Sequence, residues 1–227
     1  MLEDRVLYVD AEALVIDKPA GLPVDPPRDG GDCIVARTHE LKLGFQREPV
    51  PMHRLDRDTS GCLLLARNPK ARARFQQAFE SGSVEKTYLA VLAGVPDGGE
   101  GLIDLPLAKV STAAEGWRMV PDDQGKRAQT RWKLVAEKDG QSLVEFRPLS
   151  GRTHQIRVHA PRGLGAPVAA GENVARGAAA LPLGLCPVTD RLCDRRPDCA
   201  SSRDSGSEFE APSLGGRASV MASSSLA

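Results

Sequence analysis

The sequence contains no long hydrophobic run. Every apolar stretch falls short of the roughly 18 residues that a membrane-spanning helix needs. The N-terminus, MLEDRVLYVD, is acidic from residue 3 and has no basic region ahead of an apolar stretch, so no signal peptide is predicted. We therefore expect a cytoplasmic protein that makes no membrane contact.

The sequence also lacks paired cysteines and an excess of charge of either sign. The five cysteines follow no regular spacing and include no C-x-x-C pair, which argues against a disulfide framework and a cysteine metal site. Formal net charge is zero, with 30 basic and 30 acidic residues. Many nucleic-acid-binding proteins are basic overall, so this balance does not favour one. A local basic groove is still compatible with it, because phosphate contacts depend on the local field.

The first half of the chain predicts short strands and one helix. VLYVD and ALVIDKPAGLPV indicate two strands, the second ending in the turn signal KPAG, and the apolar run 63–66 indicates a buried strand. NPKARARFQQAFESG predicts a helix capped by Asn68, with Pro69 in its first turn and Gly82 after its end. The basic residues Arg67, Lys70 and Arg74 are expected on a solvated face of this helix.

The second half predicts strands and a hairpin. VEKTYLAVLAG is typical of a strand, and Asp139-Gly140 predicts a tight turn between two alternating strands. For SGRTHQIRVHA two alternatives stay open: Thr153 can cap a helix that starts near His154, whereas Ile156 alternates with polar residues as in a strand. Several strands per helix and no βαβ rhythm predict an α+β fold with a mixed, largely antiparallel sheet and flanking helices.

The composition changes abruptly near the C-terminus. From residue 161 onward the only aromatic residue is Phe209, and alanine, serine, glycine, proline and arginine dominate. No helix or strand period is sustained there. This composition is typical of a low-complexity segment that does not form a packed core.

One polar loop concentrates chemically useful groups. In HRLDRDTSG, Asp56 is a candidate nucleophile or base, and His53 and Arg54 can contact a phosphate or keep a carboxylate ionised. Thr59 belongs to the small polar turn that follows. About a hundred residues later a second group of arginines and histidines begins at Arg152. Spacing alone does not decide between a catalytic loop and a simple turn.

Four stretches, in order, resemble the RluA-type RNA pseudouridine synthases. HRLDRDTSGCLLLARN resembles the family signature H-R-L-D-x-x-T-S-G followed by an apolar strand, and LSGRTHQIRVHA resembles the second signature, G-R-T-H-Q-I-R-x-H. LVIDKPAGLPV and EKTYLAVLAG are similar to the N-terminal strand and turn and to the tyrosine-bearing strand. The resemblance covers roughly residues 6–160 and implies an isomerase that converts uridine to pseudouridine in transfer RNA or ribosomal RNA.

The resemblance also implies roles for individual residues. Asp56 is the expected catalytic carboxylate, either attacking the sugar or abstracting a proton, and Arg152 is expected to pair with it. Tyr88 is expected to stack on the uracil and to help remove its C5 proton, while Ile156 packs against the same base. Arg54 is expected to fill the helix gap left by the flipped base. The expected RNA-binding residues are therefore His53, Arg54, Thr59 and Ile156.

The family pattern stops after RGLGAPVA. We expect a C-terminally incomplete catalytic domain over residues 1–168 and a low-complexity, disordered or frameshifted tail over residues 169–227. Sequencing the source DNA tests the reading frame. On pattern alone, Tyr88 and Ile156 are core residues and Arg152 is a surface residue, so only the resemblance assigns them a function. We expect a monomer that needs no metal and no cofactor.

Two other functions remain open. DRDTSG, which begins at Asp56, is similar to the D-x-D-x-T motif of magnesium-dependent phosphohydrolases of the haloacid-dehalogenase type. That class needs an apolar strand ahead of its first aspartate, where this chain has PVPMHRL. The other alternative is a non-catalytic RNA-binding protein, against which the presence of Asp56, Tyr88 and Arg152 argues.

Overall fold

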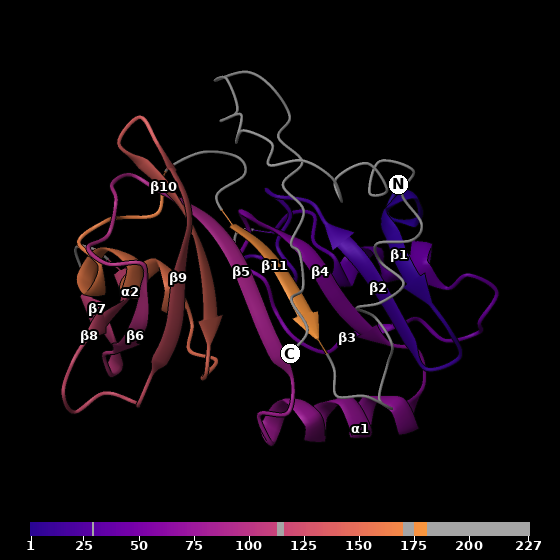
Figure 1. The fold of residues 1–227 in the computed structure, drawn as a ribbon. Helices are drawn as coiled ribbons and strands as arrows, with labels where there is room; N and C mark the ends of the chain where they lie inside the picture. The colour runs from indigo at the N-terminus through magenta and orange to yellow at the C-terminus, as the bar shows by residue number, and fades with distance from the viewer. Residues whose placement is uncertain (29, 113–115, 170–174, 181–227) are drawn as a thin grey trace. The chain divides into compact units, whose positions relative to one another are not determined.

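The structure is a computed structural model that describes residues 1–28, 30–112, 116–169 and 175–180. Its residues cluster into two compact units (Figure 1). Of the described residues, the first unit comprises those within 1–85 and 177–180, and the second comprises those within 86–176. The predicted α+β fold, built on largely antiparallel strands with few helices, is confirmed. The predicted domain limits of 1–168 and 169–227 stay a prediction.

The strands β1 to β4 of the first unit pair antiparallel with one another. They are β1 (Val6–Val9), β2 (Ala13–Lys18), β3 (Val50–Pro51) and β4 (Thr59–Ala66). β2 lies between β1 and β4, and β3 also pairs with β4. The register runs from Ala13 opposite Ala66 to Lys18 opposite Gly61. The end of β2 therefore lies beside the start of β4, where the HRLDRDTSG loop enters the sheet.

Helix α1 (Pro69–Glu80) confirms the prediction from its capping residues. The Asn68 side chain accepts a hydrogen bond from the backbone N–H of Ala71 at 2.8 Å, and Pro69 occupies the first helical position, where no N–H is needed. Phe75 is fully buried and packs with Val15 of β2 and with Leu64 of β4. The helix therefore covers one face of this sheet.

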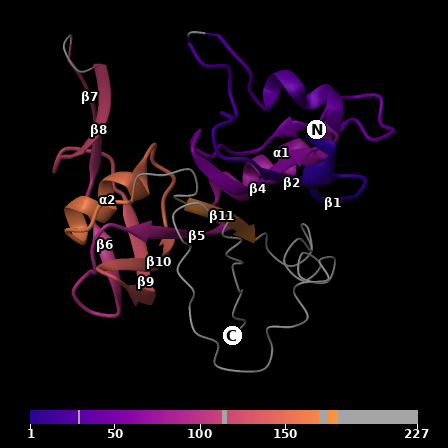
Figure 2. The same ribbon diagram turned by 90° about the horizontal axis from the view of Figure 1, so that it is seen from above.

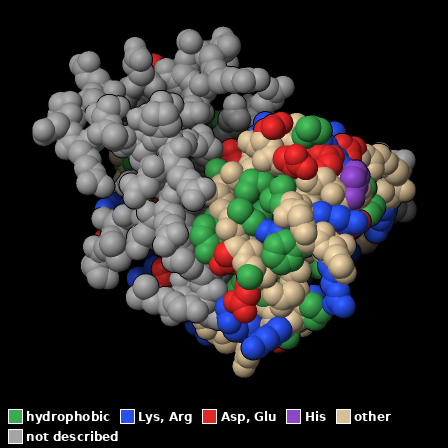
Figure 3. Space-filling model, turned by 90° about the vertical axis from the view of Figure 1, so that its right-hand side faces the viewer, with side chains coloured by type: hydrophobic (Ala, Val, Ile, Leu, Met, Phe, Trp, Pro, Cys, Tyr) green, Lys and Arg blue, Asp and Glu red, His purple; other side chains and the backbone are tan. Residues whose placement is uncertain are grey.

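Arg67 differs from its prediction because it is buried rather than solvated. Its guanidinium donates a hydrogen bond to the Lys42 carbonyl at 3.0 Å and lies 3.7 Å from the ring centre of Phe45. These contacts replace water around the charge. Phe45 itself is partly exposed, and hydrophobic side chains gather on the face of the molecule drawn in Figure 3, with charged side chains around them.

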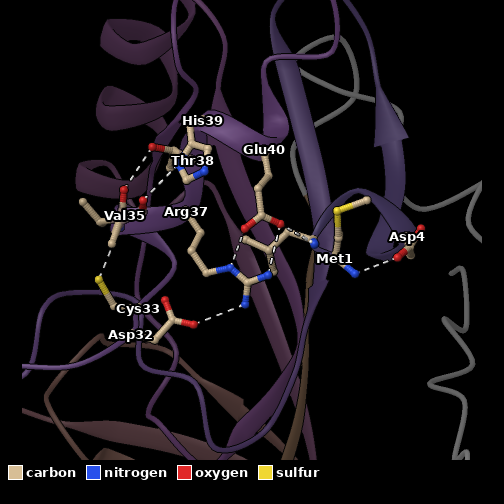
Figure 4. Close-up of polar contacts among 11 residues, drawn as sticks. Met1, Asp4, Asp32, Cys33, Val35, Arg37, Thr38, His39 and Glu40 are labelled. Carbon is tan, nitrogen blue, oxygen red and sulfur yellow. Dashed lines mark hydrogen bonds and ion pairs between the residues drawn. The ribbon is translucent and has the colours of Figure 1, made fainter.

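Two 3-10 helices, η1 (Glu3–Arg5) and η2 (Val35–Leu41), flank the first sheet. Polar contacts join η2 to the loop that precedes it and to the N-terminal segment that contains Leu2 (Figure 4). Arg37 donates to Glu40 through Nε at 2.6 Å and forms an ion pair with Asp32 at 3.3 Å, while Glu40 accepts the backbone N–H of Leu2 at 2.9 Å. Arg37 and this N–H lower the pKa of Glu40. The network anchors the loop that precedes η2.

The second unit contains four strands that pair antiparallel in the order β5-β10-β9-β6. These strands are β5 (Glu85–Leu92), β6 (Glu100–Asp104), β9 (Gln129–Lys138) and β10 (Gln141–Pro148). The predicted hairpin is confirmed: Asp139 and Gly140 both have positive φ, 52° and 75°, as its tight turn requires. β7 (Leu107–Thr112) and β8 (Gly116–Pro121) form a separate ribbon, seen beside α2 in Figures 1 and 2.

Helix α2 (Gln155–Gly163) resolves the open alternative in favour of a helix. Its N-cap is His154, not Thr153, and His154 adopts a left-handed backbone with φ of 53°. Ala160 packs with Val144 and Phe146 of the sheet. None of the described helices is long and apolar enough to span a membrane.

The last described strand is β11 (Ala175–Ala180), which was not predicted because its residues show no strand period. The rest of the predicted tail after Ala169 lies outside the described residues.

Replacing Asn68 tests the cap of α1. Asn68→Ala removes the acceptor for the Ala71 N–H and the donor to the Ala11 carbonyl, and is expected to lower the free energy of unfolding by about 1 kcal/mol. Asn68→Asp keeps the acceptor and is expected to retain most of the stability. Urea unfolding followed by circular dichroism measures both, with the exposed Arg72→Ala as a control. Equal midpoints for the alanine and wild-type proteins would contradict the role of the cap.

Candidate active site

The first part of the candidate site is the loop from Met52 to Asp58 that leads into β4. Its apolar anchor is Leu55, which is buried. The Asp56 carbonyl accepts the backbone N–H of Thr59 at 3.0 Å, which closes a turn directly before the strand. The next carbonyl, that of Arg57, accepts the backbone N–H of Gly21 at 2.9 Å. Gly21 has φ of 84°, a conformation that favours glycine. The backbone around Asp56 is therefore fixed on both sides of its side chain.

Lys18 supports this loop from within the first unit. Its side chain is 0% exposed, and Nζ donates to the carbonyls of Pro19 and Leu22 at 2.7 Å each and of Arg57 at 3.1 Å. These three acceptors match the three N–H donors of an ammonium group. Burial lowers the pKa of Lys18 to about 8, although Asp58 and Asp56 act in the opposite direction. The buried ammonium of Lys18 therefore lies close enough to Asp56 and Asp58 for their charges to act on it.

His53 and Arg54 point to different surroundings. His53 Nε2 accepts the backbone N–H of Leu64 at 3.1 Å, and its ring stacks on Phe79 with the centres 5.2 Å apart. Arg54 is exposed and forms an ion pair with Asp25 at 3.1 Å. Thr59 is buried at the start of β4. Their predicted RNA contacts stay predictions.

The second unit contains the aromatic part of the candidate site. Tyr88 lies on β5 opposite Phe146 of β10 and is half-buried. Both Tyr88 and Ile156, the second residue of α2, pack against the hydrophobic cluster that includes Phe146 and Ala160. The Tyr88 ring and the branched side chain of Ile156 are therefore held by the core, while each remains partly accessible. Such partly covered apolar surfaces suit a flat base.

Gln155 organises the loop that carries Arg152. Its Oε1 accepts the Arg152 backbone N–H and the Ser150 hydroxyl, each at 2.9 Å. Its Nε2 donates to the Gln129 carbonyl and to the Thr130 hydroxyl, each at 2.9 Å. The buried amide thus uses both of its ends and joins the loop to β9. The Arg152 side chain is exposed and donates through Nε to the Arg127 carbonyl at 3.1 Å.

The two histidines of the second signature have separate surroundings. His154 stacks on Trp117 of β8, with ring centres 5.3 Å apart. His159 is fully buried, with Nε2 3.1 Å from the Leu105 carbonyl, and Nδ1 has no hydrogen-bond partner among the described residues. Burial lowers the pKa of His159. In the part of the chain that the structure describes, no three His, Cys, Asp or Glu side chains are grouped as metal ligands.

The predicted site residues divide between the two units. His53, Arg54, Asp56 and Thr59 belong to the first unit, and Tyr88, Arg152 and Ile156 belong to the second. Sequence reasoning missed Lys18 and Gln155. The signal for Lys18 was a lysine at the end of an apolar strand, and the signal for Gln155 was its place inside the second signature.

Known proteins were compared with the chain. A family model described as RNA pseudouridylate synthase matches residues 12–161. An uncharacterised RNA pseudouridine synthase of Zymomonas mobilis is 58% identical over 168 residues, which cover 74% of this chain and 77% of the relative. Ribosomal large subunit pseudouridine synthase D of the same organism is 34% identical, covering 68% of this chain and 51% of the relative. The chain thus spans only about half the length of some curated relatives.

A solved structure shares the fold. The human RNA pseudouridylate synthase domain-containing protein 4 matches with a TM-score of 0.63 and 29% identity, covering 74% of this chain and 67% of that chain.

Replacing Lys18 tests its structural role. Lys18→Met removes the ammonium donor from the carbonyls of Pro19 and Leu22 and one of the two donors of the Arg57 carbonyl, and is expected to lower the free energy of unfolding by about 2 kcal/mol or more. The exposed Lys70→Met is the matched control and is expected to behave like wild type. Denaturant unfolding of the three proteins measures the difference. A methionine variant as stable as wild type would show that the carbonyls find other donors.

His159 is expected to make the fold sensitive to acid. Its pKa is lower in the folded chain than the ordinary value of 6.5, so the unfolded chain binds the proton more readily. The free energy of unfolding should therefore decrease as the pH falls below about 6.5. In His159→Gln this decrease should be smaller, whereas the exposed His39→Gln should retain it. Urea unfolding between pH 5 and 8 measures the effect, and parallel curves for all three proteins would contradict it.

Proposed function

The chain belongs to the RNA pseudouridylate synthase family, and from this we infer that it isomerises uridine to pseudouridine in transfer RNA or ribosomal RNA. The observation that carries the proposal is the family match over residues 12–161, which spans both signature loops and the strand between them. We propose further that the enzyme acts as a monomer in the cytoplasm, without a metal or a cofactor. Which of the two RNA classes it modifies is decided by the assay below.

The reaction conserves every atom of the nucleotide. The bond between ribose C1′ and uracil N1 breaks, the uracil rotates, and C5 bonds to C1′. The C5 proton leaves and N1 ends with a proton, so no oxidant or second substrate is needed. In this proposal Asp56 starts the reaction, either by attacking the sugar or by abstracting a proton. The fixed backbone on both sides of Asp56 supports this role because the carboxylate is held in place before RNA arrives.

Base flipping precedes the chemistry. A uridine stacked in an RNA helix hides its glycosidic bond, and unstacking it costs a few kcal/mol. Arg54 is proposed to fill the vacated position. In the part of the chain that the structure describes, Arg54 forms an ion pair with Asp25 in which both side chains are well exposed, and such pairs contribute about 0–1 kcal/mol. Arg54 can therefore exchange Asp25 for RNA at little cost.

The flipped base needs a flat apolar surface and a proton acceptor. Tyr88 and Ile156 are proposed to supply the surface, since the core holds both while leaving each partly accessible. The Tyr88 hydroxyl is proposed to take part in removing the C5 proton. Arg152 is proposed to pair with Asp56 and lower its pKa, so that the carboxylate is ionised when RNA binds. His53 and Thr59 are proposed to support the RNA contacts of the loop.

The phosphohydrolase alternative has less support from the structure. Enzymes of that type have a buried strand directly before the nucleophilic aspartate, whereas here the preceding strand β3 is only Val50–Pro51 and the long strand β4 starts after Asp56. A non-catalytic RNA-binding protein remains the other alternative. It predicts RNA binding without isomerisation.

Tritium release tests the proposal. Transfer RNA and ribosomal RNA labelled at uridine C5 are incubated separately with the wild type, with and without a chelator. Release is expected from one of them, is expected to be insensitive to the chelator, and is expected to fall by about 10²-fold or more in Asp56→Asn. Asp58→Asn, in the same loop, is the control and is expected to stay near wild type. Folding of each variant is checked by thermal unfolding.

Three results would contradict the proposal. RNA binding by wild type without tritium release would favour the binding protein. Release that a chelator abolishes would indicate metal chemistry. Full release by Asp56→Asn would exclude Asp56 as the catalytic group.

A further inference from the structure

Lys86 is a half-buried cation on β5 whose charge no described residue balances. Its ammonium neither pairs with a carboxylate nor donates a hydrogen bond within the part of the chain that the structure describes. Burial lowers its pKa, and no opposite charge acts against this effect. On the neighbouring strand, Glu145 accepts a hydrogen bond from Arg147 at 2.8 Å. Lysine is also uncommon in strands, so strand preference does not explain this residue.

The position of Lys86 links it to the candidate site of the second unit. Lys86 and Tyr88 are two residues apart on one strand, so their side chains leave the same face, about 7 Å apart along the chain. The ammonium also lies against the loop of the second signature: a methyl group placed on Gly151 would be 3.6 Å from Nζ. The next residue of that loop is Arg152. The ammonium therefore lies beside the loop that carries Arg152, on the strand that carries the proposed base-stacking residue.

An ammonium in this environment gains a compensating negative charge when an anion binds. A partly buried charge without a partner is unfavourable because it has lost water and gained no compensating contact. A methionine of similar volume would pack on the strand without this cost. This free-energy cost is offset if the ligand itself supplies the negative charge.

We propose that Lys86 binds a phosphate of the RNA backbone next to the target uridine. This inference rests on the proposed function, since the uridine is the base expected on Tyr88. When a uracil lies on Tyr88, the phosphates of the same nucleotide are the nearest full negative charges that RNA offers. Lysine contacts phosphate as a point charge and does not need the fork geometry of arginine. Such contacts fix the position of RNA without reading its sequence. Lys86 is therefore a positioning residue and not a catalytic one.

RNA binding at several salt concentrations tests the proposal. The probes are labelled transcripts of transfer RNA and ribosomal RNA, and anisotropy gives the Kd. Lys86→Met is expected to bind about tenfold more weakly, and the slope of log K against log salt is expected to decrease by about 0.7–0.9, the effect of one lost phosphate contact. Lys86→Arg keeps the charge and is expected to stay within about threefold of wild type. Lys138→Met, which removes an exposed lysine near the β9–β10 turn, is the matched control.

Kinetics separate positioning from chemistry. In the tritium assay, Lys86→Met is expected to raise KM about tenfold while kcat changes less than about threefold. Lys86→Gln provides a second neutral variant in case methionine disturbs folding, which circular dichroism checks. An unchanged salt slope in both neutral variants would overturn the proposal, and so would a loss confined to kcat. If wild type binds RNA but releases no tritium, the proposed function fails, while the salt slopes still decide whether Lys86 contacts phosphate.

Discussion

The buried ammonium of Lys18 is the interaction on which the first half of the site depends. It joins three carbonyls from two segments: two from the turn after β2 and one from the loop before β4. The register of β2 and β4 places Lys18 opposite Gly61, so the lysine lies where the HRLDRDTSG loop enters the sheet. Without this donor the carbonyls of Pro19 and Leu22 would lose the ammonium hydrogen bond, and the two segments would lose one of the hydrogen bonds that join them. The backbone next to Asp56, the proposed catalytic residue, is thus held by a residue that takes no part in the proposed chemistry.

Gln155 performs the corresponding task in the second unit. Its amide joins the backbone N–H of Arg152 to the Gln129 carbonyl and the Thr130 hydroxyl, while the Arg152 side chain stays exposed. Both signature loops therefore follow one design, in which a buried polar side chain fixes the backbone and the side chain with the proposed function remains at least partly accessible. Fully satisfied buried networks of this kind favour one arrangement over others. Positioned functional groups lower the entropy lost when a substrate binds.

The sequence predicted elements whose signals are local. Asn68 and Pro69 mark the start of α1, and Asp139-Gly140 marks the hairpin, because capping and turn formation depend on adjacent residues. The residues of the two signature stretches were assigned through a resemblance to a protein family, and the match of the family model confirms that family. Lys18, Gln155 and the buried Arg67 were missed because each donates to a carbonyl that is distant in the sequence, that of Arg57, of Gln129 and of Lys42 respectively. The choice of helix for α2 was equally out of reach, since it depends on packing of Ala160 against the sheet.

The distribution of cations explains how a chain with no net charge can serve an RNA enzyme. Lys18 is buried and its three N–H donors are all used by backbone carbonyls. It can therefore add to the electrostatic field around the loop, but it has no donor left for a contact with RNA. Arg54 is exposed and holds a weak ion pair that RNA can replace. Lys86 lies between these extremes, because it is partly desolvated and has no partner among the described residues, as suits the proposed phosphate contact. Affinity for RNA then arises from where each charge is placed, because a few desolvated cations attract phosphate more strongly than many solvated ones.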